Sequence, residues 1–266
     1  MTKFTDQQYL TTEQYKDASN LDARLEIHRR FSTNPYGWFN WVFDTLAKLP
    51  KDANVLELGT GSGALWVSIA DKIPANWNVT LSDLSQGMLD AAWRNLVVTG
   101  RNFKFEQIDA QSIPYKNETF DIVIANHMLY HVPDREKALA EIKRVLKTGG
   151  YLIATTVGEN HMKEITDWLR RIGKDHDFSP FVFSFTLENG KEQLEGFFSG
   201  VTLSRYEDTL NVTEIEPLIA CLRSAIRTSE VSEDELAKVK TDLENELKKN
   251  GRIFISKDSG LFKAIK

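Results

Sequence analysis

Short apolar runs alternate with helical stretches through the middle of the chain. The runs are rich in Val, Ile and Leu with few polar interruptions, which is typical of strands buried on both faces of a sheet. They predict strands at Val55–Leu58, Val79–Ser82, Phe103–Ile108, Phe120–Ala125 and Tyr151–Thr156. The stretches between them predict helices at Ala64–Ile73, Gly87–Thr99 and Arg135–Leu146. Strands that alternate with helices form a parallel sheet, so we expect a doubly wound α/β fold.

A second set of elements flanks this region. A helix is expected at Pro35–Leu49, with Asn34 as its N-cap and Pro35 at its first position. After the last strand of the middle region, the pattern predicts a helix, a strand and two further helices at His161–Ile172, Val201–Leu210, Thr213–Arg227 and Ser232–Lys249. We expect a final strand, Leu261–Ile265, to pair with Arg252–Ser256 across a turn at residues 257–260.

These elements suggest a division of the chain. Residues 1–50 are expected to form an N-terminal helical lid, and residues 51–266 one larger domain. Residues from about 158 to 200 are expected to form a cap inserted in that domain, and they include the aromatic loop Phe178–Phe185.

Composition and charge exclude several classes of protein. Hydrophobic residues make up 41% of the 266 residues and charged residues 27%, which is ordinary for a globular protein and excludes wholesale disorder. The net charge is −5 and no basic stripe is present, which argues against nucleic acid as a partner. No apolar run is long enough to span a membrane and the N-terminus is polar, so we expect a cytoplasmic protein. A single cysteine, Cys221, excludes an intramolecular disulfide and a cysteine-rich metal site.

The strongest local feature is a glycine-rich loop between a predicted strand and a predicted helix. It reads Glu-Leu-Gly-Thr-Gly-Ser-Gly over residues Glu57–Gly63. Glycines allow positive φ angles and a close approach of backbone to a ligand, and the helix that follows offers free N–H groups. This arrangement suits a nucleotide-like ligand at the carboxyl ends of parallel strands.

The loop alone leaves two ligands open. Gly59, Gly61 and Ala64 also satisfy the dinucleotide-binding fingerprint. Asp83 ends the next strand, where a carboxylate accepts two ribose hydroxyls of either NAD or an adenosyl ligand. Glu57 favours a cationic ligand such as a sulfonium with an ammonium group. A buried carboxylate there requires a positive or hydrogen-bonding partner, which the loop's own N–H groups could also supply.

Four segments in the same order resemble the class I S-adenosylmethionine-dependent methyltransferases. They are the glycine loop Glu57–Gly63, then Leu81–Leu89, then Asp109–Tyr115, and finally Phe120–Val123 with Tyr130–Asp134 and Glu141–Gly150. The resemblance covers residues 52–157, and one departure is Thr148, where the family commonly has proline. It implies a Rossmann-like sheet of seven strands, mostly parallel, with an antiparallel last strand.

The resemblance also implies S-adenosylmethionine as cofactor and S-adenosylhomocysteine as product. Glu57 and the loop backbone would hold the methionine part, Asp83 the ribose, and Asp109 the adenine amino group. Asn126 would lie near the methyl group. The full set of implied cofactor-binding residues is Glu57, Gly59, Thr60, Gly61, Gly63, Asp83, Leu84, Met88, Asp109, Ala110 and Asn126.

Two histidines just past the fourth strand are candidates for chemistry. His127 is a candidate general base, because it is adjacent to Asn126. The alternative is a structural histidine whose ring forms hydrogen bonds with the backbone. His131 lies four residues on, but no third ligand pattern follows, so we predict no metal site. Seven further residues could line an acceptor pocket, or could instead pack within the lid and the cap without touching a ligand. They are Tyr15, Arg29, Trp38, His131, Trp41, Phe181 and Phe183.

We therefore expect a methyltransferase that acts on a small, partly apolar acceptor. One alternative is an NAD-dependent oxidoreductase, although Glu57 and the lack of a Tyr-x-x-x-Lys pair disfavour its short-chain form. A second alternative is a protein that binds S-adenosylmethionine without catalysis. The sequence leaves the acceptor atom, the pathway and the oligomeric state open.

Overall fold

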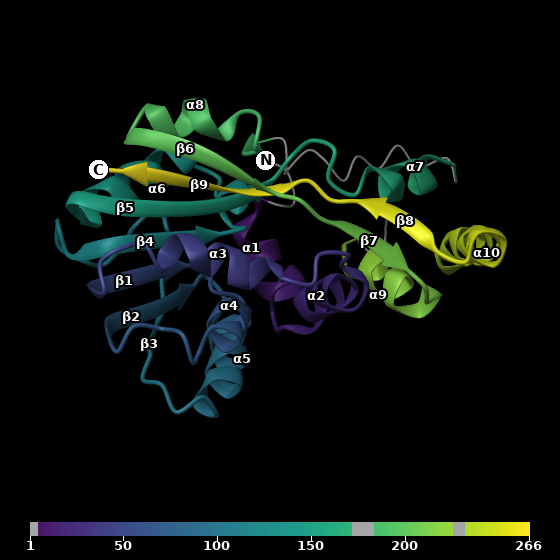
Figure 1. The fold of residues 1–266 in the computed structure, drawn as a ribbon, viewed down its shortest axis with the longest axis horizontal. Helices are drawn as coiled ribbons and strands as arrows, with labels where there is room; N and C mark the ends of the chain where they lie inside the picture. Colours follow the sequence, from purple (N-terminus) through teal and green to yellow (C-terminus); the bar gives the residue numbers. More distant parts are fainter. Residues whose placement is uncertain (1–4, 172–183, 226–231) are drawn as a thin grey trace.

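The computed structural model describes residues 5–171, 184–225 and 232–266. Within them, seven strands form one sheet in the order β3-β2-β1-β4-β5-β9-β6 (Figure 1). The strands β1 to β5 are parallel, and β9 runs antiparallel to both of its neighbours. The expected mostly parallel sheet with an antiparallel last strand is confirmed. The strand bounds are β1 Asp52–Leu58, β2 Asn76–Asp83, β3 Lys104–Gln107, β4 Phe120–Asn126, β5 Leu146–Val157, β6 Ser199–Tyr206 and β9 Ser259–Ile265.

Helices cover both faces of this sheet because successive strand residues point to opposite sides. Val55, Ile122 and Ile153 pack toward α3 (Trp38–Leu46), α4 (Ala64–Ser68) and α5 (Gln86–Val97). Their chain neighbours Leu56 and Val123 pack on the other face, toward α6 (Arg135–Val145) and α8 (Gly190–Glu195). The apolar runs of the sequence are therefore strands buried on both sides, and the doubly wound fold is confirmed.

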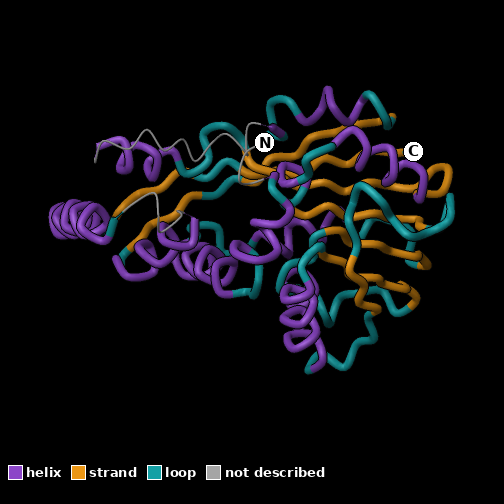
Figure 2. The backbone as a smooth tube through the Cα atoms, turned by 180° about the vertical axis from the view of Figure 1, so that it is seen from behind, coloured by secondary structure: helices purple, strands orange, loops and turns teal. Residues whose placement is uncertain are grey.

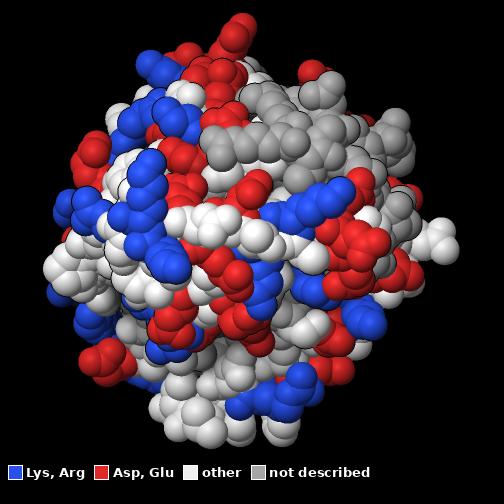
Figure 3. Space-filling model, turned by 90° about the vertical axis from the view of Figure 1, so that its right-hand side faces the viewer, with Lys and Arg blue, Asp and Glu red and all other residues white. Residues whose placement is uncertain are grey.

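A second lobe extends from one end of the sheet (Figures 1 and 2). It is built on an antiparallel pair, β7 (Thr209–Val212) and β8 (Ile253–Ser256), with a hydrophobic core of its own. Its helices are α2 (Ser19–Phe31), α7 (Lys163–Arg171), α9 (Ile215–Ala225) and α10 (Glu233–Asn250). Positive and negative side chains intermix over the face that carries α10 (Figure 3), and Lys240 of α10 forms an ion pair with Glu216 of α9.

Two strand predictions are wrong where the chain enters this lobe. The predicted strand Val201–Leu210 is two strands, β6 and β7, and Ile253–Ser256 pairs with β7 rather than with the final strand. The expected hairpin does not form, because the chain does not reverse its direction between β8 and β9. Tyr206 pairs with Ser259 and Thr209 with Ser256, so one long antiparallel ribbon passes from the main sheet into the lobe.

The N-terminal segment also differs from expectation in detail. It begins with α1 (Gln7–Tyr9) and a π-helical turn, η2 (Leu10–Gln14), ahead of α2. The helix predicted from Pro35 starts at Trp38, because Gly37 is its N-cap with a φ of 85°. Asn34 instead donates its amide to the carbonyl of Glu207, which ties this loop to the ribbon.

Other helix boundaries shift by a few residues. The predicted helix Ala64–Ile73 ends at Ser68, and the helix predicted from His161 starts at Lys163. A short 3₁₀ turn, η3 (Leu129–His131), follows β4. The loop Phe178–Phe185 lies outside the described residues apart from its last two positions. In the described part of the chain, no helix combines the length and apolar character that crossing a membrane requires.

Candidate functional site

A cavity of about 1420 Å³ lies at the carboxyl ends of the parallel strands, beside the N-terminal segment and the lobe. Its wall includes residues from the ends of β1, β2, β4 and β5, from α1 to α3, and from the lobe. Sites for one small molecule are usually about 300–1,000 Å³. This volume therefore has room for two ligands side by side.

The glycine loop forms one side of the cavity and adopts a conformation that requires glycine. Gly59 and Gly61 have φ angles of 68° and 56°, in the left-handed region. A Cβ on Gly59 would lie 2.7 Å from Cβ of Met128, and a Cβ on Gly61 would lie 2.8 Å from Cδ2 of Leu21. Thr60 also lies on the cavity wall, whereas Gly63 caps α4 with a φ of 76°.

Asp83 at the end of β2 is fixed by the same loop. Its Oδ2 accepts a hydrogen bond of 2.9 Å from the Gly61 amide, and its Oδ1 accepts one of 2.9 Å from the Ser85 amide. Burial raises the pKa of this carboxyl. A carboxylate has about four lone-pair sites, so two remain for donors from a ligand in the cavity.

The remaining residues expected around an adenosyl ligand lie on the same wall. Asp109 accepts hydrogen bonds of 2.9 Å from the Gln111 amide and from the side chain of Gln7. Asn126 accepts a bond of 2.6 Å from the Thr155 hydroxyl. Leu84, Met88 and Ala110 add apolar surface to the wall. The structure brings these predicted residues together because the strands that carry them are parallel and adjacent.

Glu57 lies beneath the loop rather than on the cavity wall. Its side chain is buried, and its Oε2 accepts a 2.6 Å hydrogen bond from the indole Nε1 of Trp66. Burial raises the pKa of Glu57 to about 7. The partner that the sequence required is thus a neutral donor on α4, which no motif of the sequence identified.

The N-terminal segment closes over the strand ends. Gln7 reaches Asp109, and Ser85 donates a 2.6 Å hydrogen bond to the carbonyl of Tyr15. Leu21 packs directly against the position of Gly61. These contacts join three parts of residues 5–31 to three different strand-end loops, so the segment roofs the cavity.

Tyr15 and His131 are joined at the cavity wall. The Tyr15 hydroxyl lies 2.9 Å from Nε2 of His131, and the two rings meet edge to face at 81°. Burial raises the pKa of Tyr15. Arg29, by contrast, lies at the rim, where it is mostly exposed and pairs with Glu26 at 2.6 Å.

His127 has a strained backbone. Its φ of 52° is left-handed, which is uncommon for a residue other than glycine. Its amide donates to the carbonyl and the hydroxyl of Thr155, and its ring packs against Trp38 at 5.3 Å. Burial and the nearby Lys257 ammonium lower the pKa of His127 to about 4, so its imidazole is neutral at pH 7.

Sequence reasoning missed three residues on the wall next to His127. They are His28, His161 and Lys257. They come from segments far apart in the sequence, so spacing gave no signal for them. Within residues 5–171, 184–225 and 232–266, no three His, Cys, Asp or Glu side chains lie together in a way that could hold a metal ion. Of the predicted cap aromatics, Trp41 packs on Trp38, whereas Phe181 and Phe183 lie outside the described residues.

Comparison with known proteins agrees with this arrangement. A family model described as a methyltransferase domain matches residues 56–154. A ubiquinone/menaquinone biosynthesis C-methyltransferase, UbiE, of Francisella tularensis subsp. novicida is 31% identical over 147 residues, which cover 54% of this chain and 57% of that protein. The chain thus spans a little over half the length of such curated relatives. The resemblance inferred from the four sequence segments is confirmed for this part of the chain.

Solved structures share the fold. One, from Bacillus halodurans, has a TM-score of 0.58 and 23% identity, and the match covers 86% of this chain and 98% of the other. Another, phosphoethanolamine N-methyltransferase 2 of Haemonchus contortus solved with S-adenosyl-L-methionine, has a TM-score of 0.59 and 19% identity. That match covers 100% of this chain and 60% of the other. Identities this low establish the common architecture only.

Proposed function

We propose that this chain, with a methyltransferase domain at residues 56–154, is an enzyme that methylates a small-molecule acceptor with S-adenosylmethionine as donor. The observation that carries the proposal is the position of Asp83. Its carboxylate is held by the Gly61 and Ser85 amides at the cavity wall, with lone pairs left for a diol.

The residues of this wall fit the cofactor. Asp83 would accept the ribose hydroxyls, and Asp109 with the Ala110 amide would bind the adenine, whose faces Leu84 and Met88 would contact. The backbone of Gly59, Thr60, Gly61 and Gly63 would hold the methionine part, and Asn126 would lie near the reacting end. The cofactor, when bound, supplies an activated methyl group. Glu57 would act from beneath the loop, where its ionised form would attract an ammonium group.

The other half of the cavity would bind the acceptor. Methyl transfer is an in-line displacement, so the protein has to hold the acceptor in line and remove its proton where it has one. Tyr15, Trp38 and His131 would contact the acceptor, with Arg29 at the entrance. His127 is neutral at pH 7 and would take the proton on a ring nitrogen.

We also propose that residues 1–50 act as a lid over this site. The contacts Gln7–Asp109 and Tyr15–Ser85 support this role, because they tie the segment to loops that would surround the cofactor. A closed lid would exclude water during transfer. The remaining residues, 51–266, would form the catalytic domain, with the expected cap at about 158–200.

A thermal-shift measurement with S-adenosylhomocysteine and, in parallel, NADH tests the proposal. At 100 times its Kd a ligand stabilises by about 2.7 kcal/mol, which raises Tm by roughly 5–10 °C at this size. We expect a shift with S-adenosylhomocysteine alone. A shift with NADH alone would favour an oxidoreductase. Cofactor binding without turnover over a broad acceptor panel would favour a non-catalytic binding protein.

A further inference from the structure

Four basic side chains converge on one wall of the cavity. They are His28 of α2, His127 after β4, His161 before α7, and Lys257 at the junction of β8 and β9, and we refer to them as the basic wall. The rings of His28 and His161 lie 6.3 Å apart. His127 is the member of this group that follows Asn126 in the chain, and its ring packs against Trp38.

Lys257 is the only permanent charge among these four side chains. It is buried and forms an ion pair with Asp208. That carboxylate is shared with other donors: it accepts from the Ser32 hydroxyl at 2.7 Å and from the amides of Thr33 and Asn34 at 3.1 and 3.0 Å. Asp208 is therefore committed to holding the loop after α2 as well as to Lys257.

The ammonium of Lys257 acts on all three histidines. Burial is the first cause that lowers their pKa values, and Lys257 is the second in each case. The pKa of His161 falls to about 3, and there the effect of Lys257 exceeds the opposing effect of Asp208. The wall therefore places one buried ammonium, paired with Asp208, beside three neutral imidazoles at the cavity.

The histidines of the wall also have hydrogen-bonding capacity to spare. Nδ1 of His161 accepts a 3.1 Å bond from the Asp258 amide, so the ring proton is on Nε2, which is a donor. Nδ1 of His28 is buried and has no hydrogen-bond partner. An unsatisfied buried ring nitrogen is unfavourable, and because this atom is not exposed to the cavity, a ligand would reach it only after a turn of the ring.

We propose that the basic wall binds an anionic group, a carboxylate or a phosphate, on the methyl acceptor. This inference rests on the proposed function, since it identifies the ligand with the acceptor. The neighbouring aromatic side chain of Trp38, whose ring centroid lies 5.3 Å from that of His127, would contact the apolar part of the same molecule. An anion beside Lys257 would offset the part of the lowered basicity of His127 that comes from this ammonium, while the larger effect of burial would remain. An acceptor with the anionic group would thus help to prepare its own base.

The alternative is that Lys257 and Asp208 only hold the ribbon together. The two accounts predict different affinities for three phenyl compounds: benzoate, the neutral benzamide of nearly the same shape, and the larger phenyl phosphate. Calorimetric titration of each probe into the wild-type protein saturated with S-adenosylhomocysteine tests this difference. We expect at least one anion to bind tenfold or more tightly than benzamide, and the better anion identifies carboxylate or phosphate as the natural group.

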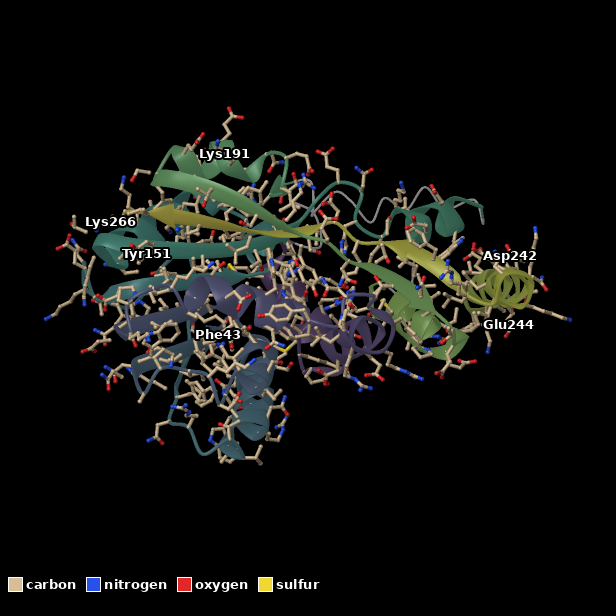
Figure 4. All side chains as sticks on the ribbon, viewed as in Figure 1. Phe43, Tyr151, Lys191, Asp242, Glu244 and Lys266 are labelled. Atoms are coloured by element: carbon tan, nitrogen blue, oxygen red, sulfur yellow. The ribbon has the colours of Figure 1, made fainter. Side chains whose placement is uncertain are left out.

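A pair of variants then tests the residues. The double variant Lys257→Gln/Asp208→Asn removes the charge without leaving a lone buried carboxylate, and Lys257→Arg keeps the charge. We expect anion affinity to fall at least tenfold in the double variant and to be largely retained with arginine. Lys191→Gln is the matched control, because Lys191 is an exposed lysine on α8 (Figure 4) and should leave anion affinity within twofold.

Three results would overturn the inference: no anion binding, neither benzoate nor phenyl phosphate bound more tightly than benzamide, or undiminished anion binding in the double variant. The first two need only wild-type protein, so they decide the matter even where the double variant fails to fold. Titration of S-adenosylhomocysteine in the same series reports on the proposed function separately. Anion preference without S-adenosylhomocysteine binding would contradict the cofactor and leave the anion site standing.

Discussion

Asp208 and Lys257 form a buried ion pair at the point where the antiparallel ribbon leaves the main sheet. They lie between the last pair of the sheet, Tyr206 with Ser259, and the first pair of the lobe, Thr209 with Ser256. Asp208 also holds the loop after α2. One carboxylate thus connects the sheet, the lobe and the N-terminal segment beside the cavity.

This pair should matter far more for stability than an exposed one. Asp208→Ala would leave a buried ammonium without its carboxylate and remove acceptors from the Ser32–Asn34 loop, which we expect to lower the free energy of unfolding by about 3–5 kcal/mol. Urea denaturation measures this change. Glu195→Ala removes half of the exposed Lys191–Glu195 pair and should cost less than about 1 kcal/mol. Equal losses in the two variants would contradict the account.

The buried carboxyl of Glu57 should make stability depend on pH. Its pKa is about 7 in the folded protein and 4.5 in the unfolded chain, so the folded state binds the proton more tightly. Its stabilising contribution is complete below pH 4.5 and is lost as the pH rises through 7. Glu57→Gln keeps an acceptor for Trp66 and removes this titration. We expect the stability of the variant relative to wild type to rise by about 1–3 kcal/mol between pH 5 and pH 8 in urea denaturation.

A constant difference across that range would mean that Glu57 does not titrate near neutrality. Glu195→Gln, at an exposed position on α8, serves as the control and should show no such trend.

Two glycines with similar φ angles allow the cost of backbone strain to be distinguished from the cost of a steric clash. Gly61 and Gly100 have φ angles of 56° and 68°, but a Cβ would meet Leu21 at Gly61 and nothing within 4 Å at Gly100. Alanine at either position should cost about 1–2 kcal/mol from the left-handed backbone. Gly61→Ala should cost more, and should weaken S-adenosylhomocysteine binding at least tenfold in calorimetry, because it displaces the roof of the cavity. Unchanged affinity would show that the loop and Leu21 move apart without consequence for the ligand.

The sequence predicts the half of the site that is built locally. The glycine loop, Asp83 and Asp109 each end or follow a strand, and parallel order alone brings such ends to one edge of the sheet. The prediction that Arg252–Ser256 pairs with the final strand was wrong, because residues 257–260 do not reverse the chain. Lys257 pairs with Asp208 at this point, and the ribbon continues.

The basic wall could not be predicted in this way. His28, His161 and Lys257 meet only because the lobe folds back beside the N-terminal segment, and that depends on the packing of α2 against α9 and the ribbon. The hydrogen-bond partner of Glu57 could not be predicted from the sequence for a similar reason. The orientation of Trp66 on α4 follows from helix packing rather than from sequence spacing.

If the chain uses an adenosyl cofactor, Asp83 should hold its ribose. Calorimetric titration of S-adenosylhomocysteine into wild type, Asp83→Asn and Asp90→Asn, an exposed control position, tests this role. Loss of charge-assisted hydrogen bonds of about 1.5–3 kcal/mol predicts affinity roughly 10- to 100-fold weaker for Asp83→Asn. The Asp90→Asn control should match wild type. Equal affinity in all three proteins, or no binding to wild type, would contradict the account.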